Sequence, residues 1–485
     1  MGATYLGIDV GTSSVKSALF DPDQALIGQA SHSFDVSRPH PGWSEQDPAD
    51  WWTGVLETVD ALAKAHGLGT LRGIGLSGQM HGAVCLDADD TVLRPAILWN
   101  DGRAGAECAE IEAACPDSRR IAGNIAMPGF TAPKLQWLRR HEPDLFDRIA
   151  MVLLPKDHVR LMLTGHHVSE MSDAAGTLWL DVAARDWSDD LLAATGLARA
   201  QMPRLVEGSA VSGHLRSDLA DRWGAPGDVV VAGGAGDNAA SACGVGVVKP
   251  GRAFVSLGTS GVLFVSNAAF SPNTDGAVHA FCHAIPDTWH QMGVILSAAD
   301  SLEWLAGITG KPAADLAGSV DARAGPSDLT FLPYLSGERT PHNDPAARGA
   351  FAGLSRSHTV ADMARAVMEG VAYAFADCQA ALADAGSDFD SALAVGGGAK
   401  SETWLRIVAS VLDRPIVITA DSGLGAALGA ARLAICAAED ADPAEIFAEP
   451  GILRVIDPDP ALVARYSEGR FRYRGLYPAL KAAGA

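Results

Sequence analysis

The stretch TYLGIDVGTSSVKSALFD, residues 4–21, contains an apolar strand, a turn of glycine, threonine and serine, and a second β-like run. This pattern predicts a β-hairpin closed by a glycine-rich turn. Such a turn can present backbone N–H groups and hydroxyls to an anion, but the carboxylate of Asp9 precedes it and would repel that anion. A Mg²⁺ ion between Asp9 and a bound phosphate would remove the conflict.

The same scheme recurs in GRAFVSLGTSGVLFVS, residues 251–266, with Gly258 and Thr259 at the turn. Gly-Thr-Ser is also common turn chemistry, which is a sufficient explanation for either hairpin alone. A hairpin at the start of each half, followed each time by alternating strands and helices, instead predicts two related α/β domains that face one ligand.

We place the boundary in VVKPGR, residues 247–252, so that the predicted domains are residues 1–247 and 248–485. Three helices stand out within them. Pro48 after Asp47 is typical of a helix start, and that helix should run to His66. Helices are also predicted for TVADMARAVMEGVAYAFADCQAAL (359–382) and for the small residues of GLGAALGAARLAICA (423–437).

Composition excludes several classes of function. The chain has 485 residues and a net charge of -21, which argues against nucleic acid or an anionic membrane as a partner. A nucleotide stays open, because it needs only a local site. Seven cysteines without a C-x-x-C pair suggest reduced thiols, and no apolar run is long enough to span a membrane. We therefore expect a cytoplasmic protein.

Three glycine motifs resemble nucleotide-binding loops. GIGLSG (73–78) fits G-x-G-x-x-G, but the residues after it do not predict the helix that this fingerprint needs. GITGKPA (307–313) contains Gly-Lys without the P-loop spacing. VGGGAKSETW (395–404) runs from a strand to a helix, and its glycines would allow either a tight turn or the close approach of a flat ring.

The stretch GGAGDNAA, residues 233–240, places Asp237 and Asn238 where an apolar strand and a turn meet the start of a helix. Asp237 could serve as a helix N-cap. It could equally act as a general base at the carboxyl end of a strand, where open α/β sheets bind their ligands. Phosphoryl transfer suits such a carboxylate, because the attacking hydroxyl must be oriented and must lose its proton.

Longer motifs show a family resemblance over nearly the whole chain. GFTAPKLQWLRRH (129–141) and GAFAGLSRSHTVADMARAVME (349–369) resemble the two signature stretches of the FGGY family of carbohydrate kinases. SGQMHGA, LLPKDHVR, SDAAGTLWLD and FLPYLSGERTPHND are similar to the members that act on D-xylulose. The resemblance implies an actin-like ATPase fold, in which two ribonuclease-H-like domains flank a central cleft. It also implies ATP-dependent phosphorylation of D-xylulose to D-xylulose 5-phosphate.

The resemblance further implies roles for single residues. Asp237 matches the catalytic base of the family, and Asp9 matches the carboxylate that helps to hold Mg²⁺ near the phosphates. The sugar is expected to contact Met80, His81, Trp99 and Asn238. ATP is expected to contact Thr12, Lys16, Gly258, Thr259, Gly397, Gly398 and Ala399.

Other functions stay open at this stage. The substrate could be another ketose or a polyol, such as ribulose or glycerol. A sugar sensor without catalysis could keep the same fold, and an actin-like or Hsp70-like ATPase would hydrolyse ATP without a sugar. Family members often form dimers, so the resemblance also allows a homodimer.

Overall fold

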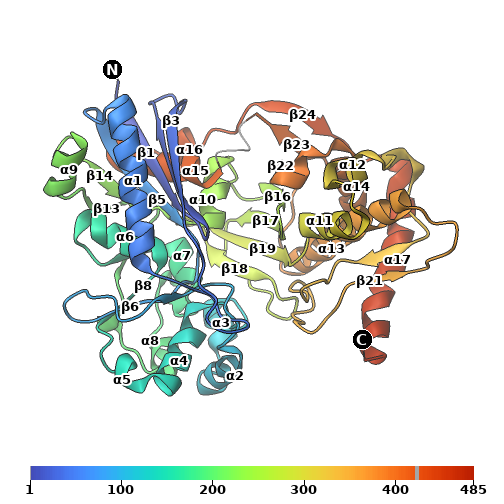
Figure 1. Cartoon of the computed structure of the whole chain (residues 1–485), viewed down its shortest axis with the longest axis horizontal. Coiled ribbons are helices and arrows are strands. Elements are labelled where there is room, and N and C mark those ends of the chain that lie inside the picture. The colour runs from blue at the N-terminus through green and yellow to red at the C-terminus, as the bar shows by residue number, and fades with distance from the viewer. Residues whose placement is uncertain (1, 421–424, 485) are drawn as a thin grey trace.

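The computed structural model describes residues 2–420 and 425–484. It has two lobes, each built around a seven-stranded sheet. Figure 1 shows the N-terminal half, in blue and green, on one side and most of the C-terminal half, in yellow to red, on the other.

The N-terminal sheet combines an antiparallel meander with parallel strands. In spatial order its strands are β13 (Val211–His214), β14 (Val230–Ala232), β5 (Leu71–Gly78), β1 (Thr4–Val10), β2 (Ser14–Phe20) and β3 (Leu26–Ser33). The pairs β1–β2 and β2–β3 are antiparallel, whereas β5 is parallel to both β1 and β14. A seventh strand, β15 (Ala235–Gly236), also pairs with β5 in parallel.

The C-terminal sheet repeats this topology. In spatial order its strands are β18 (His279–Cys282), β19 (Trp289–Ile295), β17 (Gly261–Asn267), β16 (Ala253–Leu257), β22 (Ala392–Val395), β23 (Ile416–Thr419) and β24 (Ile452–Ile456). Here β16, β17 and β19 form the meander, and β22 and β23 are the parallel strands. Both sheets thus run 3-2-1-4-5, which is the ribonuclease-H-like arrangement expected for an actin-like ATPase.

Both predicted hairpins are confirmed. In the first, β1 and β2 pair antiparallel, and Asp9 lies opposite Lys16. In the second, β16 and β17 pair in the same way, and Ser256 lies opposite Val262. The two glycine-containing turns therefore occupy equivalent places in the two sheets.

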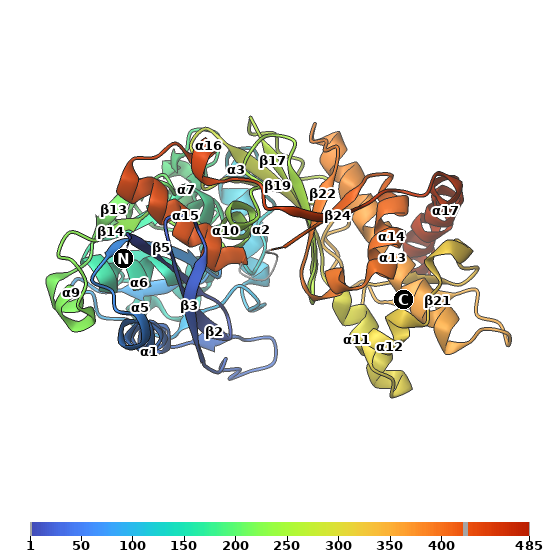
Figure 2. The same ribbon diagram turned by 90° about the horizontal axis from the view of Figure 1, so that it is seen from above.

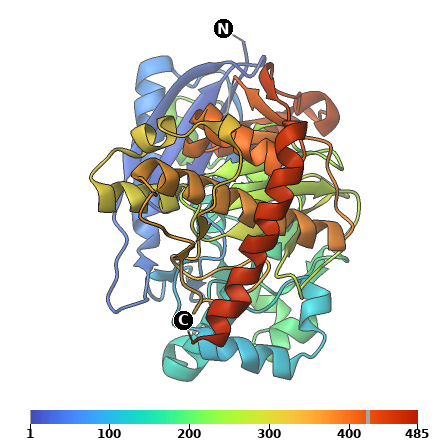
Figure 3. The ribbon, with the colours of Figure 1, turned by 90° about the vertical axis from the view of Figure 1, so that its right-hand side faces the viewer.

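The other elements surround these sheets. The helices of the N-terminal half are α1 (Pro48–His66), α2 (Gly105–Ala114), α3 (Ser118–Ala122), α4 (Thr131–His141), α5 (Pro143–Phe146), α6 (Pro155–Thr164), α7 (Met171–Ala175), α8 (Asp189–Ala194), α9 (Ser217–Trp223) and α10 (Asp237–Gly244). Those of the C-terminal half are α11 (Ala299–Thr309), α12 (Ala313–Gly318), α13 (Val360–Asp384), α14 (Glu402–Leu412), α15 (Gly425–Glu439), α16 (Pro443–Ile446) and α17 (Pro460–Ala482). Short two-stranded pairings join β4 (Glu45–Gln46) to β7 (Ala96–Ile97), β6 (Val84–Leu86) to β8 (Met151–Leu153), β9 (Val168–Glu170) to β12 (Arg204–Val206), β10 (Leu180–Asp181) to β11 (Asp186–Trp187) and β20 (Thr330–Leu332) to β21 (Ala350–Ala352). Figure 3 shows α17 crossing the outer face of the C-terminal lobe.

The three predicted helices are present. α1 begins at Pro48, after the N-cap Asp47, whose side chain accepts a hydrogen bond from the Ala49 N–H at 2.9 Å. α13 covers the predicted segment almost residue for residue. α15 is described from Gly425, and residues 423–424 of the predicted segment lie outside the described residues.

α15 comes from the second half of the chain but packs against α10 and against β1 and β5 of the first sheet (Figure 2). Glycines make this contact close. A Cβ atom on Gly75 would lie 1.8 Å from the carbonyl oxygen of Ala430, and one on Gly429 would lie 1.8 Å from that of Ala240. The boundary at 247–252 stays a prediction, and α15 is one part of 248–485 that packs on the N-terminal sheet.

Candidate active site

Asp237 is the first residue of α10, directly after β15. The N-cap of this helix is Gly236, so the alternative role of Asp237 as N-cap is wrong. One carboxylate oxygen of Asp237, Oδ1, accepts hydrogen bonds from the backbone N–H of Asn238 at 2.7 Å and from its Nδ2 at 3.0 Å. The two residues therefore form one polar unit at the helix start.

Asp9 lies near the end of β1, opposite Ser77 of β5. The Ser77 hydroxyl donates to Asp9 Oδ1 at 3.0 Å. Burial raises the pKa of Asp9, and the hydrogen bond from Ser77 and the charge of Lys16 oppose this rise. Burial and then the charge of Asp9 raise the pKa of Asp237 to about 7. The structure thus brings the two predicted carboxylates close enough to repel each other.

The turn after β1 is held by side chains from three other segments. The Thr12 hydroxyl donates to Gln79 Oε1 at 3.2 Å and accepts from the indole Nε1 of Trp99 at 2.9 Å. The Gln46 side chain donates to the Thr12 carbonyl at 2.6 Å and accepts from Gln79 Nε2 at 3.0 Å. Within the turn, the Gly11 N–H donates to the Ser14 carbonyl at 3.0 Å. Its conformation is therefore fixed by the fold.

Trp99 is 47% exposed although its N–H is bound to Thr12. Near Trp99 in the sequence, the guanidinium of Arg103 lies 3.5 Å from the centre of the Trp43 ring and pairs with Asp101 at 2.7 Å. The exposed fraction and the hydrogen bond together leave much of the Trp99 ring open beside the first turn. A partly exposed aromatic ring in this position can pack against a sugar.

Met80 and His81 follow β5, whose last residue, Gly78, pairs with Gly236 just before Asp237. His81 has a φ of 70°, and its Nδ1 lies 2.5 Å from the Gly176 carbonyl oxygen. Burial lowers the pKa of His81 to about 3, so the ring is neutral, Nδ1–H donates to the carbonyl and Nε2 is an acceptor. Met80 packs against the turn before Asp237, because a Cβ on Gly236 would lie 2.9 Å from Met80 Cγ.

The second turn belongs to the other sheet and is joined to the start of α11. The Gly258 carbonyl accepts from the Ala299 N–H at 2.9 Å, and the Thr259 carbonyl accepts from the Ala298 N–H at 2.8 Å. The backbone of this turn is therefore anchored, as in the first turn, by an element outside the hairpin.

Gly397, Gly398 and Ala399 form a single 3₁₀ turn between β22 and α14. This turn packs against the end of β16. Gly396 has a φ of 92°, and a Cβ on it would lie 2.8 Å from the Leu257 carbonyl oxygen. Gly397 has no atom within 4 Å of its Cβ position, so this side of the turn is open. The predicted adenosine-side turn and the second phosphate turn are thus neighbours.

The predicted residues therefore form two groups, one in each lobe. Lys16 lies opposite Asp9 on β2, with an exposed side chain. Their roles toward sugar, ATP and metal stay predictions. Sequence analysis missed Gln46, Ser77 and Gln79, which hold the first turn and Asp9. Ser77 and Gln79 lie in the motif SGQMHGA, but the motif alone does not show which of its residues hold a turn, and no motif quoted above contains Gln46.

Three further observations concern only the described part of the chain. It contains no group of three or more His, Cys, Asp or Glu residues arranged to hold a metal ion. None of its helices has the length and apolar character that a membrane crossing requires. All seven cysteines are unpaired, which agrees with the reduced thiols expected from the sequence.

Comparison with known proteins extends over almost the whole chain. The N-terminal domain of the FGGY family of carbohydrate kinases matches residues 4–244, and the C-terminal domain of that family matches residues 253–438. The xylulose kinase of Escherichia coli (strain K12) is 48% identical over 479 residues, covering 98% of this chain and 99% of the relative.

Two more relatives agree. The xylulose kinase of Klebsiella pneumoniae is 46% identical, and the match covers 98% of this chain and 99% of the relative. A crystal structure of a "xyloylose kinase" from Brucella ovis superposes with a TM-score of 0.96 at 55% identity, covering 99% of this chain and all of that one. The chain belongs to the FGGY family of carbohydrate kinases, with the two-domain actin-like ATPase fold of that family.

Proposed function

We propose that this protein transfers the γ-phosphoryl group of ATP to the terminal hydroxyl of D-xylulose, giving D-xylulose 5-phosphate and ADP. One observation carries the proposal: Asp237, with a pKa raised to about 7, begins α10 directly after Gly236, against which Met80 packs. A base of this pKa is suited to take a proton near neutral pH. The xylulose kinases that match nearly the full length of the chain support the choice of substrate.

The residues around Asp237 are proposed to have separate roles in sugar binding and proton transfer. The N–H groups of Asn238 direct Asp237 Oδ1, so that the carboxylate can accept the proton of the sugar hydroxyl as it attacks phosphorus. Neutral His81 offers Nε2 as a hydrogen-bond acceptor to another hydroxyl. Trp99 offers an apolar face to the carbon skeleton.

ATP is proposed to bind between the lobes. The turn at Thr12 and the turn at Gly258 and Thr259 would contact its phosphates, with Lys16 at the edge of the first turn. The open 3₁₀ turn at Gly397, Gly398 and Ala399 would face the adenosine. Two turns at equivalent places in two related sheets support this arrangement.

The residues present fit Mg²⁺. Removal from water raises the pKa of both Asp9 and Asp237, and the charge of Asp9 raises that of Asp237 further; a nearby divalent cation would oppose both effects. Magnesium bound with nucleotides usually takes one or two protein carboxylates and keeps water and phosphate as its other ligands. Asp9 is the residue proposed to hold it. When bound, the ion would neutralise charge on the phosphates during transfer.

The test is ADP release by the purified protein with MgATP and a panel of pentuloses, pentitols and glycerol, measured against a blank without sugar. Stimulation by D-xylulose above the rest of the panel is the expected result. Preference for ribulose or glycerol would keep the kinase and overturn the substrate. A high rate without sugar would favour a motor-like ATPase, and no release at all would favour a sensor. Cytoplasmic location and a homodimer stay predictions.

A further inference from the structure

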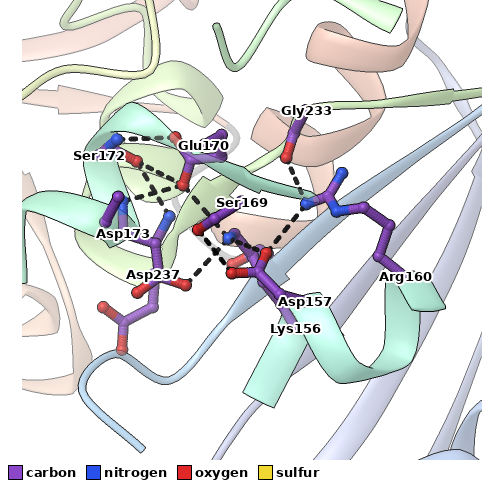
Figure 4. A network of polar contacts seen from close by, with 12 residues as sticks. Lys156, Asp157, Arg160, Ser169, Glu170, Ser172, Asp173, Gly233 and Asp237 are labelled. Atoms are coloured by element: carbon purple, nitrogen blue, oxygen red, sulfur yellow. Dashed lines mark hydrogen bonds and ion pairs between the residues drawn. The ribbon is translucent and has the colours of Figure 1, made fainter. Parts of the chain in front are cut away.

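A network of charged side chains is buried directly behind Asp237 (Figure 4). The Lys156 ammonium lies 2.7 Å from Asp157 Oδ1, 3.0 Å from Asp173 Oδ2 and 3.4 Å from Glu170 Oε1. The guanidinium of Arg160 lies 3.3 Å from Asp157 Oδ1. All five side chains have no exposed surface.

These charges come close to balance. Burial, together with the charges of Asp157 and Glu170, raises the pKa of Asp173 well above its ordinary value, against the attraction of Lys156. With Asp173 protonated, the two cations face two carboxylates. A charge-balanced set of buried ion pairs is rigid, because moving one member leaves another without its partner.

The network reaches the turn before Asp237 at both ends. At the first end, Arg160 donates to the carbonyl oxygens of Ala232 and Gly233, each at 2.6 Å. At the second end, the Ser172 hydroxyl accepts a hydrogen bond from the Gly236 N–H at 3.1 Å. This N–H is the last backbone donor before Asp237.

The direction of the Ser172 hydroxyl is set by Glu170. Ser172 Oγ donates its proton to Glu170 Oε1 at 3.0 Å, so a lone pair of the oxygen is free to accept the Gly236 N–H. Glu170 is itself fixed as the N-cap of α7, because it accepts the backbone N–H groups of Ser172 at 2.7 Å and Asp173 at 2.9 Å. Lys156 pairs with the same oxygen, Glu170 Oε1, that accepts the proton of Ser172.

The turn depends on such contacts because glycine supplies most of its residues. A Cβ on Gly233 would lie 2.1 Å from the Glu207 carbonyl oxygen, and one on Gly234, at φ 74°, would lie 2.2 Å from that of Leu76. Only glycine fits these places, and glycine leaves the backbone more freedom than other residues. Hydrogen bonds from the surroundings must therefore fix the path of the chain into Asp237.

We propose that Ser172 is a positioning residue for phosphoryl transfer: its hydroxyl, oriented by Glu170, fixes the Gly236 peptide and thereby the carboxylate of Asp237. The proposal rests on the proposed function, because it assumes that Asp237 accepts the proton. Ser172 acts on the reaction only through the backbone. Misplacement of a reacting group by about 1 Å can lower a rate by about 100-fold.

The test compares Ser172→Ala with a matched control, Ser410→Ala. Ser410, in α14 of the other lobe, is also a buried serine whose hydroxyl accepts a backbone N–H, that of Asp459, at 3.1 Å. It donates to the Arg406 carbonyl at 2.9 Å. Each variant loses one accepted backbone N–H and one donated hydrogen bond, so both melting temperatures should fall, that of Ser172→Ala at least as far because its donated bond goes to a carboxylate. Only Ser172→Ala should lower kcat, by about 10- to 100-fold, with the KM for ATP within twofold of wild type.

Two more variants test whether the hydroxyl itself matters. Ser172→Thr keeps the acceptor and should recover at least a third of wild-type kcat, whereas Ser172→Cys offers a weaker acceptor and should fall about 3- to 10-fold. These variants also decide the question if Ser172→Ala does not fold. Wild-type kcat in the folded Ala or Cys variant, or an equal loss in Ser410→Ala, would overturn the proposal. A wild-type protein that phosphorylates no sugar would instead refute the proposed function.

Discussion

Replacing Asp237 with asparagine should change activity and stability in opposite directions. The substitution keeps the shape of the side chain but removes the proton acceptor, so kcat should fall by about 10² to 10⁴. This loss corresponds to about 3 to 5 kcal/mol in the activation free energy. The two turns proposed to contact ATP are unchanged, so the KM for ATP should stay within about twofold of wild type.

The stability effect follows from the raised pKa. The carboxyl has an ordinary pKa of 3.8 and a folded-state pKa of about 7. The unfolded chain therefore releases its proton first, and the stability that the protonated group contributes is lost as pH rises from about 4 to 7. Three pKa units correspond to about 4 kcal/mol, which partial exposure of the side chain reduces to about 2 kcal/mol. Asparagine does not ionise and avoids this loss.

Urea unfolding of the protein without nucleotide and Mg²⁺, at pH 5 and pH 8, measures the stability effect. The free energy of unfolding of Asp237→Asn should exceed that of wild type at pH 8, and the difference should shrink at pH 5. Asp344→Asn is the control, because hydrogen bonds from Tyr477 and Lys481 lower the pKa of Asp344. That variant should be less stable than wild type at pH 8 and keep its kcat. A kcat of Asp237→Asn within tenfold of wild type would refute Asp237 as the base.

Three further predictions test other parts of the site and core. The kcat/KM for sugar should fall about tenfold per pH unit below about 7, as Asp237 becomes protonated, and a flat profile from pH 5 to 7 would contradict this role. Burial raises the pKa of Glu369 to about 8, so the stability that its protonated carboxyl contributes is lost between about pH 4.5 and 8. Glu369→Gln should remove this loss from the free energy of urea unfolding, and an unchanged pH dependence would contradict the prediction. Trp99→Phe keeps an aromatic face but loses the hydrogen bond to Thr12. In steady-state kinetics the KM for ATP should therefore rise about 2- to 10-fold, while the KM for sugar stays within twofold. A larger rise in the KM for sugar would assign the Trp99 N–H to sugar binding.

Much of the fold could be predicted because its signals are local. One continuous segment of sequence contains each whole hairpin pattern: an apolar strand, a turn of small residues and a second strand. The start of α1 is equally local, since Asp47 and Pro48 cap it within two residues. The packing of α15 on the first sheet had no such signal. It depends on Gly75 meeting Ala430, residues that are far apart in the sequence.

The candidate site divides in the same way. Asp9 and Asp237 could be predicted from local signals. Asp9 lies near the end of a strand, before a turn of small and polar residues, and Asp237 lies where a glycine-rich turn meets the start of a helix. Gln46 and Gln79 could not, because a glutamine in a polar motif gives no sign that it will hold a turn. Their partner Thr12 is 34 and 67 residues away from them in the chain.

The buried network behind Asp237 is the clearest failure of sequence reasoning. Lys156, Asp157 and Arg160 are three charged residues within the first six positions of α6, and charged residues on a helix usually indicate a solvated face. Their burial also bears on what these charged side chains contribute to the fold. Buried ion pairs often add no stability over apolar side chains of similar size, because the cost of removing charges from water offsets their attraction. Apolar side chains, however, could not donate to two successive carbonyls, as Arg160 does, or orient the hydroxyl of Ser172, as Glu170 does. Placement of the turn is therefore the contribution that only the polar network can make, which is why Ser172→Ala should change kcat more than it changes stability.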